Sequence, residues 1–392
     1  MTTNRPVRIG LLWHSANSGN LGVGALTEAN LALLRREVAA LGLVAEFVII
    51  GFKDPWPDYV TGADVSVVKL STRTMLSPAG YWRELSGLDC IFDIGGGDSW
   101  ADIYGWKRFG FLWLTKVLAA WRTVPLVFSP QTIGPFTRAP YLALASFAMR
   151  RATHIVVRDP LSRDVAAMMV PGKAIVEAVD VAFALPFDQA AQATDGVTQV
   201  GINVSGLLFN KGYGGDNAFG LEADYAALMR TLVAELVARS DVKVFLFTHV
   251  VAPDLPMDDD GPVADSLAAD FPSVERVANF ASPSAAKSFI SGMDFVVSGR
   301  MHACIAAYSS GVPVVPVAYS RKFSGLFEGV LGYPHAVPVT GLSTEGALAH
   351  ILNAFANRHK LAAEIEIGNR KVAAALDRYR AVIRDLLQDV AK

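Results

Sequence analysis

The strongest chemical pattern in the chain is an arginine and a histidine two positions apart, Arg300 and His302. They lie where an apolar run, Phe295–Ser298, gives way to a helical pattern over His302–Ser309. An arginine beside a helix N-terminus makes an anion site, because the guanidinium and the unbonded N–H groups of the first turn both attract negative charge. A histidine there is suited to general acid–base catalysis. The pattern predicts an anion site with a proton-transfer group, and a structural histidine is the alternative.

Three further side chains at the ends of short apolar runs are candidate ligand contacts: Arg158, Lys322 and His249. A guanidinium such as that of Arg158 can bind a carboxylate or a phosphate through two parallel hydrogen bonds. Lys322 would neutralise a phosphate, and His249 would face the same ligand. Each has a structural alternative. For Arg158 it is an ion pair with Asp159 or another acid. For Lys322 it is solvation, and for His249 it is simple burial.

A turn rich in glycine and asparagine follows the first apolar run, in the segment Ser15–Glu28. Asn20 and Gly22 let the backbone turn tightly and expose N–H groups at the start of a helix. Such groups suit an anion or a polar ligand oxygen. The alternative is an ordinary connection between a strand and a helix.

Three consecutive glycines occur in the segment Asp93–Asp98. Gly96 and Gly97 permit close approach of a ligand or of the facing domain to the backbone, and we expect Asp98 at or near a helix start, at the rim of a cleft. Gln131, which follows another apolar run, would orient a hydroxyl group. Turn formation alone is the alternative for both segments.

Apolar runs alternate with helical patterns along the whole chain. Continuous apolar strands between helices are typical of a parallel sheet covered on both faces. We therefore expect an α/β protein of two Rossmann-like, doubly wound domains that face a cleft at the carboxyl ends of their strands. A change of composition at Leu185–Val197 predicts domains at residues 1–190 and 191–392, the second ending in a long helix. The expected strands are Val7–Trp13, Val44–Ile50, Cys90–Ile94, Leu126–Ser129, His154–Val157, Ala174–Val176, Val200–Val204, Val242–Phe247, Phe295–Ser298 and Val314–Ala318. The expected helices are Thr27–Val38, Tyr225–Arg239, Ser284–Ser291, His302–Ser309, Leu342–Arg358 and Ala363–Val390.

The composition excludes several classes of protein. With 52% hydrophobic and 18% charged residues, the 392-residue chain is not a disordered protein. Its net charge of −2 gives no reason to expect a nucleic-acid partner. Two cysteines, Cys90 and Cys304, exclude a disulfide framework and a Cys-rich zinc site, and we expect no metal. The acidic residues Asp258–Asp260 are expected in a solvated loop.

The first residues lack the layout of a signal peptide, and no apolar stretch reaches the length of a membrane span, so we expect a cytoplasmic protein. An aromatic stretch near Trp106, with Lys107 and Arg108, is where a lipid-linked substrate would bring the protein to the inner face of the membrane. The oligomeric state does not follow from the sequence.

The motifs in this order, between about Ile9 and Tyr333, resemble the polysaccharide pyruvyl transferase family. Each motif is weak alone, and the ordered set is specific. The motifs are Gly19–Gly22, Gly95–Gly97, Gln131–Phe136, Val157–Asp159 with Ser162, Arg300–His302, Gly311–Pro313, and Tyr319 with Lys322.

The resemblance implies a GT-B-like fold and transfer of the enolpyruvyl unit of phosphoenolpyruvate to a sugar. The usual product is a cyclic pyruvate ketal on two hydroxyls, in exopolysaccharide or cell-wall glycan. Phosphoenolpyruvate would be a substrate, with no further cofactor, and Arg158, Arg300 and His302 would contact it. The first domain would take the acceptor, a sugar or a lipid-linked oligosaccharide, and the second domain the donor.

One departure from the family pattern is Val23, where the family commonly has an acidic residue. It keeps two other functions open. One is a glycosyltransferase that uses a nucleotide-sugar donor, and the other is a non-catalytic protein that binds a sugar phosphate.

Overall fold

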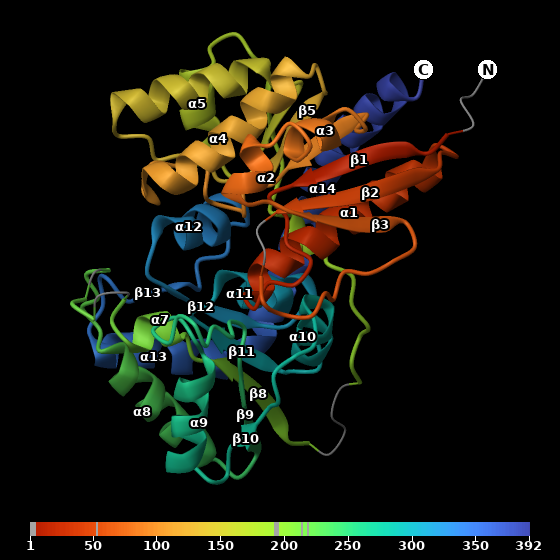
Figure 1. The fold of residues 1–392 in the computed structure, drawn as a ribbon. Coiled ribbons are helices and arrows are strands. Elements are labelled where there is room, and N and C mark those ends of the chain that lie inside the picture. Colours follow the sequence, from red (N-terminus) through yellow and green to blue (C-terminus); the bar gives the residue numbers. More distant parts are fainter. Residues whose placement is uncertain (1–4, 52–53, 192–195, 213–214, 218) are drawn as a thin grey trace. The chain divides into compact units, whose positions relative to one another are not determined.

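The computed structural model describes residues 5–51, 54–191, 196–212, 215–217 and 219–392, which form two compact units (Figure 1). Unit 1 comprises the described residues of 1–18, 26–184 and 373–392. Unit 2 comprises those of 19–25 and 185–372. The chain therefore enters unit 2 twice, first for a few residues after the first strand. The predicted turn around Asn20 and Gly22 belongs to unit 2.

Unit 1 is built on a parallel sheet of seven strands in the order β3-β2-β1-β4-β5-β6-β7. The chain runs from β1 outward to β3 and returns beside β1 as β4, which places the reversal of strand order between β1 and β4. Strands β4 and β5 are buried at every residue, as expected for a sheet with helices on both faces. The strands are β1 Val7–Leu12, β2 Ala45–Gly51, β3 Val65–Lys69, β4 Cys90–Asp93, β5 Leu126–Gln131, β6 His154–Val157 and β7 Ile175–Glu177. The helices of this part of the chain are α1 Leu21–Ala40, α2 Thr72–Leu76, α3 Tyr81–Leu85, α4 Gly105–Trp121, α5 Ala139–Arg151, α6 Pro160–Met169 and the 3-10 helix Val181–Ala184.

Unit 2 repeats the architecture with a parallel sheet of six strands, in the order β10-β9-β8-β11-β12-β13. Its strand order reverses between β8 and β11, and the residues of β11 and β12 are all buried. The strands are β8 Thr198–Asn203, β9 Val242–Phe247, β10 Glu275–Arg276, β11 Phe295–Ser298, β12 Val314–Ala318 and β13 Val337–Pro338. The helices are α7 Gly206–Phe209, α8 Tyr225–Val237, α9 Gly261–Asp270, α10 Pro283–Ile290, α11 Met301–Ser309, α12 Arg321–Ser324, the π-helix Gly325–Val330, α13 Thr344–Ala356 and α14 Arg358–Val390.

The predicted fold class, two Rossmann-like parallel-sheet domains, agrees with these two sheets. The predicted strands recur within about two residues at each end, and β3, β10 and β13 are additional. Helix α1 begins at Leu21 instead of Thr27, because the Asn20 Oδ1 accepts a hydrogen bond from the Gly22 N–H (3.0 Å) and starts the helix earlier.

The two compact units differ from the predicted division in the terminal helix. Its last part, from Ala373, belongs to unit 1. The hydroxyl of Tyr379 there hydrogen-bonds to Asn30 and Ser129 (both 2.9 Å), and Arg380 and Arg384 pair with the buried Glu37. These polar contacts, added to an apolar stripe, hold the end of the chain on unit 1. The other change of unit falls between Ala184 and Leu185.

Candidate functional site

The start of α11, at the carboxyl end of β11, carries the strongest predicted motif. Arg300 is the N-cap residue of this helix, with an extended backbone, and it makes no side-chain cap. The Ser298 hydroxyl instead accepts a hydrogen bond from the Arg300 N–H (2.9 Å) and donates one to Asn203 (2.8 Å). The Arg300 side chain carries no acceptor atom, so it cannot cap the first N–H groups of α11. These groups are left to another acceptor, for which an anion is suited.

The Arg300 guanidinium is bound by the acidic loop. Nη1 lies 2.7 Å from Asp258 Oδ1, and Nη2 lies 2.7 Å from Asp260 Oδ1. Burial lowers the pKa of Arg300, but the charges of Asp260 and Asp258 outweigh it and leave this pKa above its ordinary value. The guanidinium is therefore cationic and engaged within unit 2, while the predicted contact of Arg300 with a substrate stays a prediction.

The prediction that Asp258–Asp260 form a solvated loop is wrong. Asp259 and Asp260 are buried. One carboxylate oxygen of Asp260 accepts hydrogen bonds from the backbone N–H groups of His249 and Val250 (both 3.0 Å). The charges are buried because the backbone and Arg300 satisfy them, which the sequence pattern did not reveal.

His302 lies in the first turn of α11 and is half-buried. A methyl group at Gly22 would overlap the Nδ1 atom of the imidazole, so this glycine is required by close packing. The turn before Gly22 is joined to the segment after β9, because the Leu21 N–H donates to the His249 carbonyl (3.0 Å) and Asn20 bridges Val250. The predicted residues Asn20, Gly22, His249, Arg300 and His302 thus come together within unit 2.

His249 is buried at the end of β9. Burial, and secondarily the charges of His302 and Arg300, lower its pKa to about 3. His249 is therefore neutral at neutral pH. Its predicted contact with substrate stays a prediction. Lys322, at the carboxyl end of the next strand, β12, lies on α12 with its ammonium 5.9 Å from the ring centre of Tyr319.

The backbone conformation of the triple glycine in unit 1 favours glycine at all three positions. Gly95, Gly96 and Gly97 all have positive φ angles (55°, 62° and 91°), which L side chains rarely adopt. A methyl group at Gly95 would overlap the side-chain oxygen of Gln131, and one at Gly97 would lie 2.8 Å from Leu26. The atoms that approach these glycines are side chains of unit 1, and the predicted approach of a ligand stays a prediction.

Asp98 was expected at or near a helix start, and this prediction is wrong. The next helix, α4, begins only at Gly105. The chain between them is held in another conformation by a bridge of Trp100 to Ile133 and by the Asp102 carboxylate, which accepts the Thr137 N–H (2.7 Å). The predicted substrate contacts of Asp98, Gly96 and Gly97 stay predictions.

Arg158 lies at the end of β6 and pairs with a buried acid. Its Nη1 atom lies 2.6 Å from Asp180 Oδ2, and both side chains are buried. The structural alternative was an ion pair with Asp159 or another acid; the partner is another acid, Asp180, while Asp159 caps α6 by accepting the Ser162 N–H (2.7 Å). Gly97 faces the same Nη1 atom, at 3.6 Å from a methyl group placed on that glycine. Arg158 and the triple glycine therefore adjoin.

Sequence reasoning missed a buried ion pair beneath the triple glycine. Lys116 of α4 and Asp93 at the end of β4 are both fully buried, with Nζ and Oδ1 3.1 Å apart. Burial raises the pKa of Asp93 and lowers that of Lys116. The Gln131 amide donates to the other Asp93 oxygen (3.1 Å). Gln131, which was predicted to contact substrate, therefore also stabilises the buried ion pair. The available signal was that Lys116 is the one charged residue in the run Phe109–Trp121.

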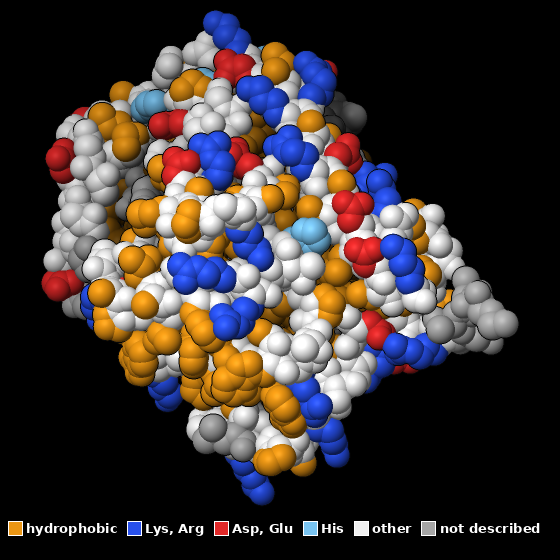
Figure 2. Space-filling view, turned by 90° about the horizontal axis from the view of Figure 1, so that it is seen from above, with side chains coloured by type: hydrophobic (Ala, Val, Ile, Leu, Met, Phe, Trp, Pro, Cys, Tyr) orange, Lys and Arg blue, Asp and Glu red, His pale blue; other side chains and the backbone are white. Residues whose placement is uncertain are grey.

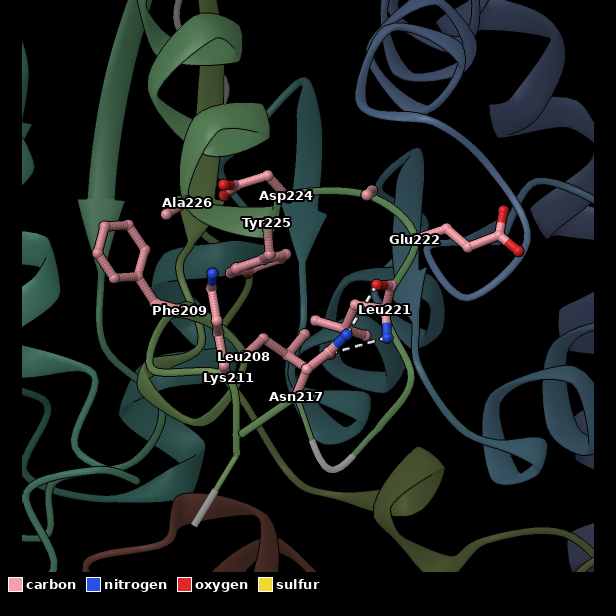
Figure 3. A pocket seen from close by; sticks show the side chains of 10 residues that line it. Leu208, Phe209, Lys211, Asn217, Leu221, Glu222, Asp224, Tyr225 and Ala226 are labelled. Atoms are coloured by element: carbon pink, nitrogen blue, oxygen red, sulfur yellow. Dashed lines mark hydrogen bonds between the residues drawn. The ribbon is translucent and has the colours of Figure 1, made fainter. Parts of the chain in front are cut away.

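Two pockets lie away from the predicted site residues. One of about 180 Å³ lies between the loop after α7 and the start of α8, and Figure 3 shows Lys211 and Tyr225 among its lining. The other, of about 360 Å³, includes Thr198, Asp294 and Arg358. Within the described ranges, no three His, Cys, Asp or Glu side chains are arranged to hold a metal ion.

Comparison with known proteins decides the family. The model of the polysaccharide pyruvyl transferase family matches residues 20–321. The chain belongs to this family. It is therefore a transferase. The match includes every predicted site residue except Lys322, which follows its last position. No curated protein matches the chain.

Solved structures with little sequence identity share the fold. A Rickettsia africae glycosyltransferase has a TM-score of 0.57 at 11% identity, covering 98% of this chain and 99% of its own. Anabaena HepE in complex with UDP and glucose has a TM-score of 0.54 at 14% identity, covering 98% of both chains. Staphylococcus aureus MnaA with UDP has a TM-score of 0.56 at 10% identity, covering 96% and 95%. These similarities confirm the predicted GT-B-like fold.

Proposed function

We propose that this family member transfers the enolpyruvyl unit of phosphoenolpyruvate to a sugar and closes a pyruvate ketal on two of its hydroxyls. The observation that carries the proposal is His302, which lies in the matched region, in the first turn of α11 and against Gly22. A proton donor next to a helix start suits a trianionic substrate whose methylene carbon must be protonated. Exopolysaccharide or cell-wall glycan is the proposed destination of the product.

In the proposed reaction His302 donates a proton to C3 of phosphoenolpyruvate, which becomes a methyl group. The first sugar hydroxyl attacks C2, forms a C–O bond and loses its proton. The C2–O bond to phosphate then breaks, and a second hydroxyl closes the ketal and loses its proton. The two released protons balance the proton given to C3 and the one taken up by phosphate. The chemistry calls for no cofactor besides the donor substrate.

Anion binding in unit 2 is proposed to rest on the N–H groups at the start of α11, with Lys322 as a phosphate contact. Arg300 already binds Asp258 and Asp260, so its proposed role is to hold the N-cap in place and thereby position His302. Arg158 of unit 1 remains a proposed donor contact. Asp98, Gly96, Gly97 and Gln131, also of unit 1, are the proposed acceptor contacts.

Titration calorimetry with phosphoenolpyruvate and the purified full chain tests the donor. Wild type is expected to bind it, and Arg158→Ala is expected to weaken binding while the protein stays folded by circular dichroism. Arg370→Ala, on an exposed part of α14, is the matched control and should bind normally. Absence of binding by folded wild type at millimolar donor would contradict the proposal.

A nucleotide-sugar glycosyltransferase is the second candidate, favoured by the UDP that HepE and MnaA hold on the same fold. Binding of UDP-glucose with transfer or hydrolysis, in the absence of any reaction with phosphoenolpyruvate, would favour it. The valine at position 23 also leaves a sugar-phosphate binding protein without turnover, which would bind a ligand and convert neither donor.

A further inference from the structure

The charge of the chain is unevenly distributed around α4 and α5. Residues 103–158 contain no Asp or Glu and eight Lys or Arg. Lys116 and Arg158 are buried in the ion pairs of unit 1. The other six are exposed or half-buried: Lys107, Arg108, Arg122, Arg138, Arg150 and Arg151. The flanking acid Asp102 is buried and bonded to the Thr137 N–H. A net charge near −2 therefore conceals a basic surface on unit 1.

Large apolar side chains are exposed at both ends of α4, where the surface of a helix in water is usually polar. After Lys107, the positions Phe111, Leu114, Leu118 and Trp121 recur at helical spacing and are all at least partly exposed. Phe111, Leu114 and Leu118 pack in part against the core of unit 1, and the rest of their surface is exposed. The Trp121 side chain is 63% exposed. An indole exposed to this extent, next to other exposed apolar side chains, marks a contact surface.

More aromatic and aliphatic side chains surround the start of α4. Ile103 is 61% exposed and Trp106 is 55% exposed. The Arg108 guanidinium lies 4.8 Å from the ring centre of Tyr104, and on α5 the Arg151 guanidinium lies 3.5 Å from that of Phe147. Cations thus lie directly beside exposed rings. We call this surface, formed by Ile103–Trp121 and by α5, the α4–α5 face.

The view from above shows the same arrangement. In the lower half of Figure 2, hydrophobic side chains gather into a patch with Lys and Arg side chains around it, and acidic side chains are sparse there. Helices α4 and α5 lie on the upper side of unit 1 in Figure 1. The two helices are joined directly, because the Trp113 indole donates to the Leu144 carbonyl (2.9 Å) and the Trp106 and Tyr141 ring centres lie 5.0 Å apart.

We propose that the α4–α5 face binds the surface of an anionic phospholipid bilayer. Exposed tryptophans suit the boundary between headgroups and acyl chains, and the surrounding cations suit anionic headgroups. None of the described helices is long and apolar enough to cross a bilayer, so the contact is peripheral. A second copy of the chain is a poorer partner, since symmetric pairing would oppose two basic surfaces. The proposal is independent of the reaction proposed for the site.

Co-sedimentation of the full chain with vesicles tests the proposal. Wild type is expected to sediment with phosphatidylcholine vesicles that contain phosphatidylglycerol, to remain in solution with phosphatidylcholine alone, and to dissociate in high salt. Lys107→Glu is expected to weaken binding by about fivefold or more, the value for loss of one cation at such a surface. Trp121→Ser is expected to weaken it at every salt concentration.

Ile367→Ser and Arg370→Glu, on exposed positions of α14, are the matched apolar and charge controls and should bind as wild type. Failure of wild type to bind the anionic vesicles would overturn the proposal. So would vesicle binding that both face variants leave unchanged. Light scattering that shows a dimer in wild type and a monomer in Trp121→Ser would identify the face as a self-association surface instead, and would also overturn it.

Discussion

Both sheets carry an arginine at the carboxyl end of a strand, and the two arginines are held differently. Arg158 is bonded to Asp180 through one terminal nitrogen. Arg300 is held through all three of its guanidinium nitrogens by Asp258 and Asp260. Two acids around one guanidinium make Arg300 part of the fold of unit 2. The same residue type at the same place in a sheet therefore need not have the same task.

The ionisable groups near the carboxyl edges of the two sheets also differ in how they are held. In unit 1, Asp93 and Lys116 neutralise each other in the core and Gln131 completes the network. In unit 2, His302 is half-buried at a helix start, beside the neutral His249. A closed network favours a structural role, whereas a titratable group at the edge of a helix start favours chemistry.

The largest expected effect is on catalysis by His302. His302→Asn should lower the rate of ketal formation by about 100- to 10,000-fold, the range for loss of a general acid, with little change in binding of phosphoenolpyruvate. His359→Asn, on α14, is the control and should retain activity. A rate within a few-fold of wild type would show that His302 is not the general acid. The carboxyl edge of the unit 2 sheet would then not differ from that of unit 1 in carrying a catalytic group.

The structural role of Arg300 predicts a large loss of stability when its acidic partner Asp260 is removed. Asp260→Ala should destabilise the protein by roughly 3–5 kcal/mol, because it removes the carboxylate that accepts from Arg300 Nε and Nη2 and from the backbone N–H groups of His249 and Val250. Denaturant unfolding measures this. Asp93→Asn should have a similar cost, and combining it with Lys116→Met should recover part of it, since both charges are then removed. A loss below about 1 kcal/mol for Asp260→Ala would contradict a structural role for Arg300.

The packing of Gly22 on His302 predicts a smaller effect on turnover. Gly22→Ala should displace the imidazole and lower turnover by up to about 100-fold, as small misplacements of reacting groups do. The affinity for phosphoenolpyruvate should change less. Gly110→Ala, where the added methyl group meets open space, is the matched control in unit 1. Unchanged turnover in Gly22→Ala would show that the orientation of His302 does not matter.

The buried histidines predict a pH dependence of stability in each unit. Burial lowers the pKa of His14 in unit 1 and of His249 in unit 2 to about 3. The unfolded chain takes up protons near pH 6.5 and the folded chain does not, so stability is full above that pH and falls as the pH drops toward 3. Each histidine should contribute about 1.4 kcal/mol of loss per pH unit. His249→Gln should flatten the dependence of the unfolding free energy on pH between 6.5 and 5, and an unchanged slope would contradict the burial.

The sequence predicted the fold well because its signal is local. Runs such as Phe295–Ser298 are apolar at every position, which is the pattern of a strand buried on both faces. The edge strand Val65–Lys69 escaped because it is short and partly exposed. The start of α1 escaped because it depends on the Asn20 side chain.

The candidate site was predicted only in part, because the partners of its side chains leave no local signal in the sequence. Gly22 and His302 were both predicted at the carboxyl ends of strands, but these strands belong to different sheets, so their contact did not follow from the sequence. The partners of Arg300 could not be found, because three consecutive acids look like a solvated loop until the hydrogen bonds of Asp260 are known. Lys116 was visible only as an interruption of an apolar helix, and its partner Asp93 is distant in sequence.

We propose, as the central point, that His302 at the carboxyl edge of the unit 2 sheet is the proton donor in pyruvyl transfer. Its most direct test incubates phosphoenolpyruvate and a panel of glycosides bearing neighbouring hydroxyls with wild type or His302→Asn, and follows phosphate release and the mass of the product. Wild type should release phosphate in step with formation of a pyruvate ketal, and the variant, folded and able to bind the donor, should do neither at a comparable rate. Equal phosphate release and ketal formation by the two proteins would contradict the account.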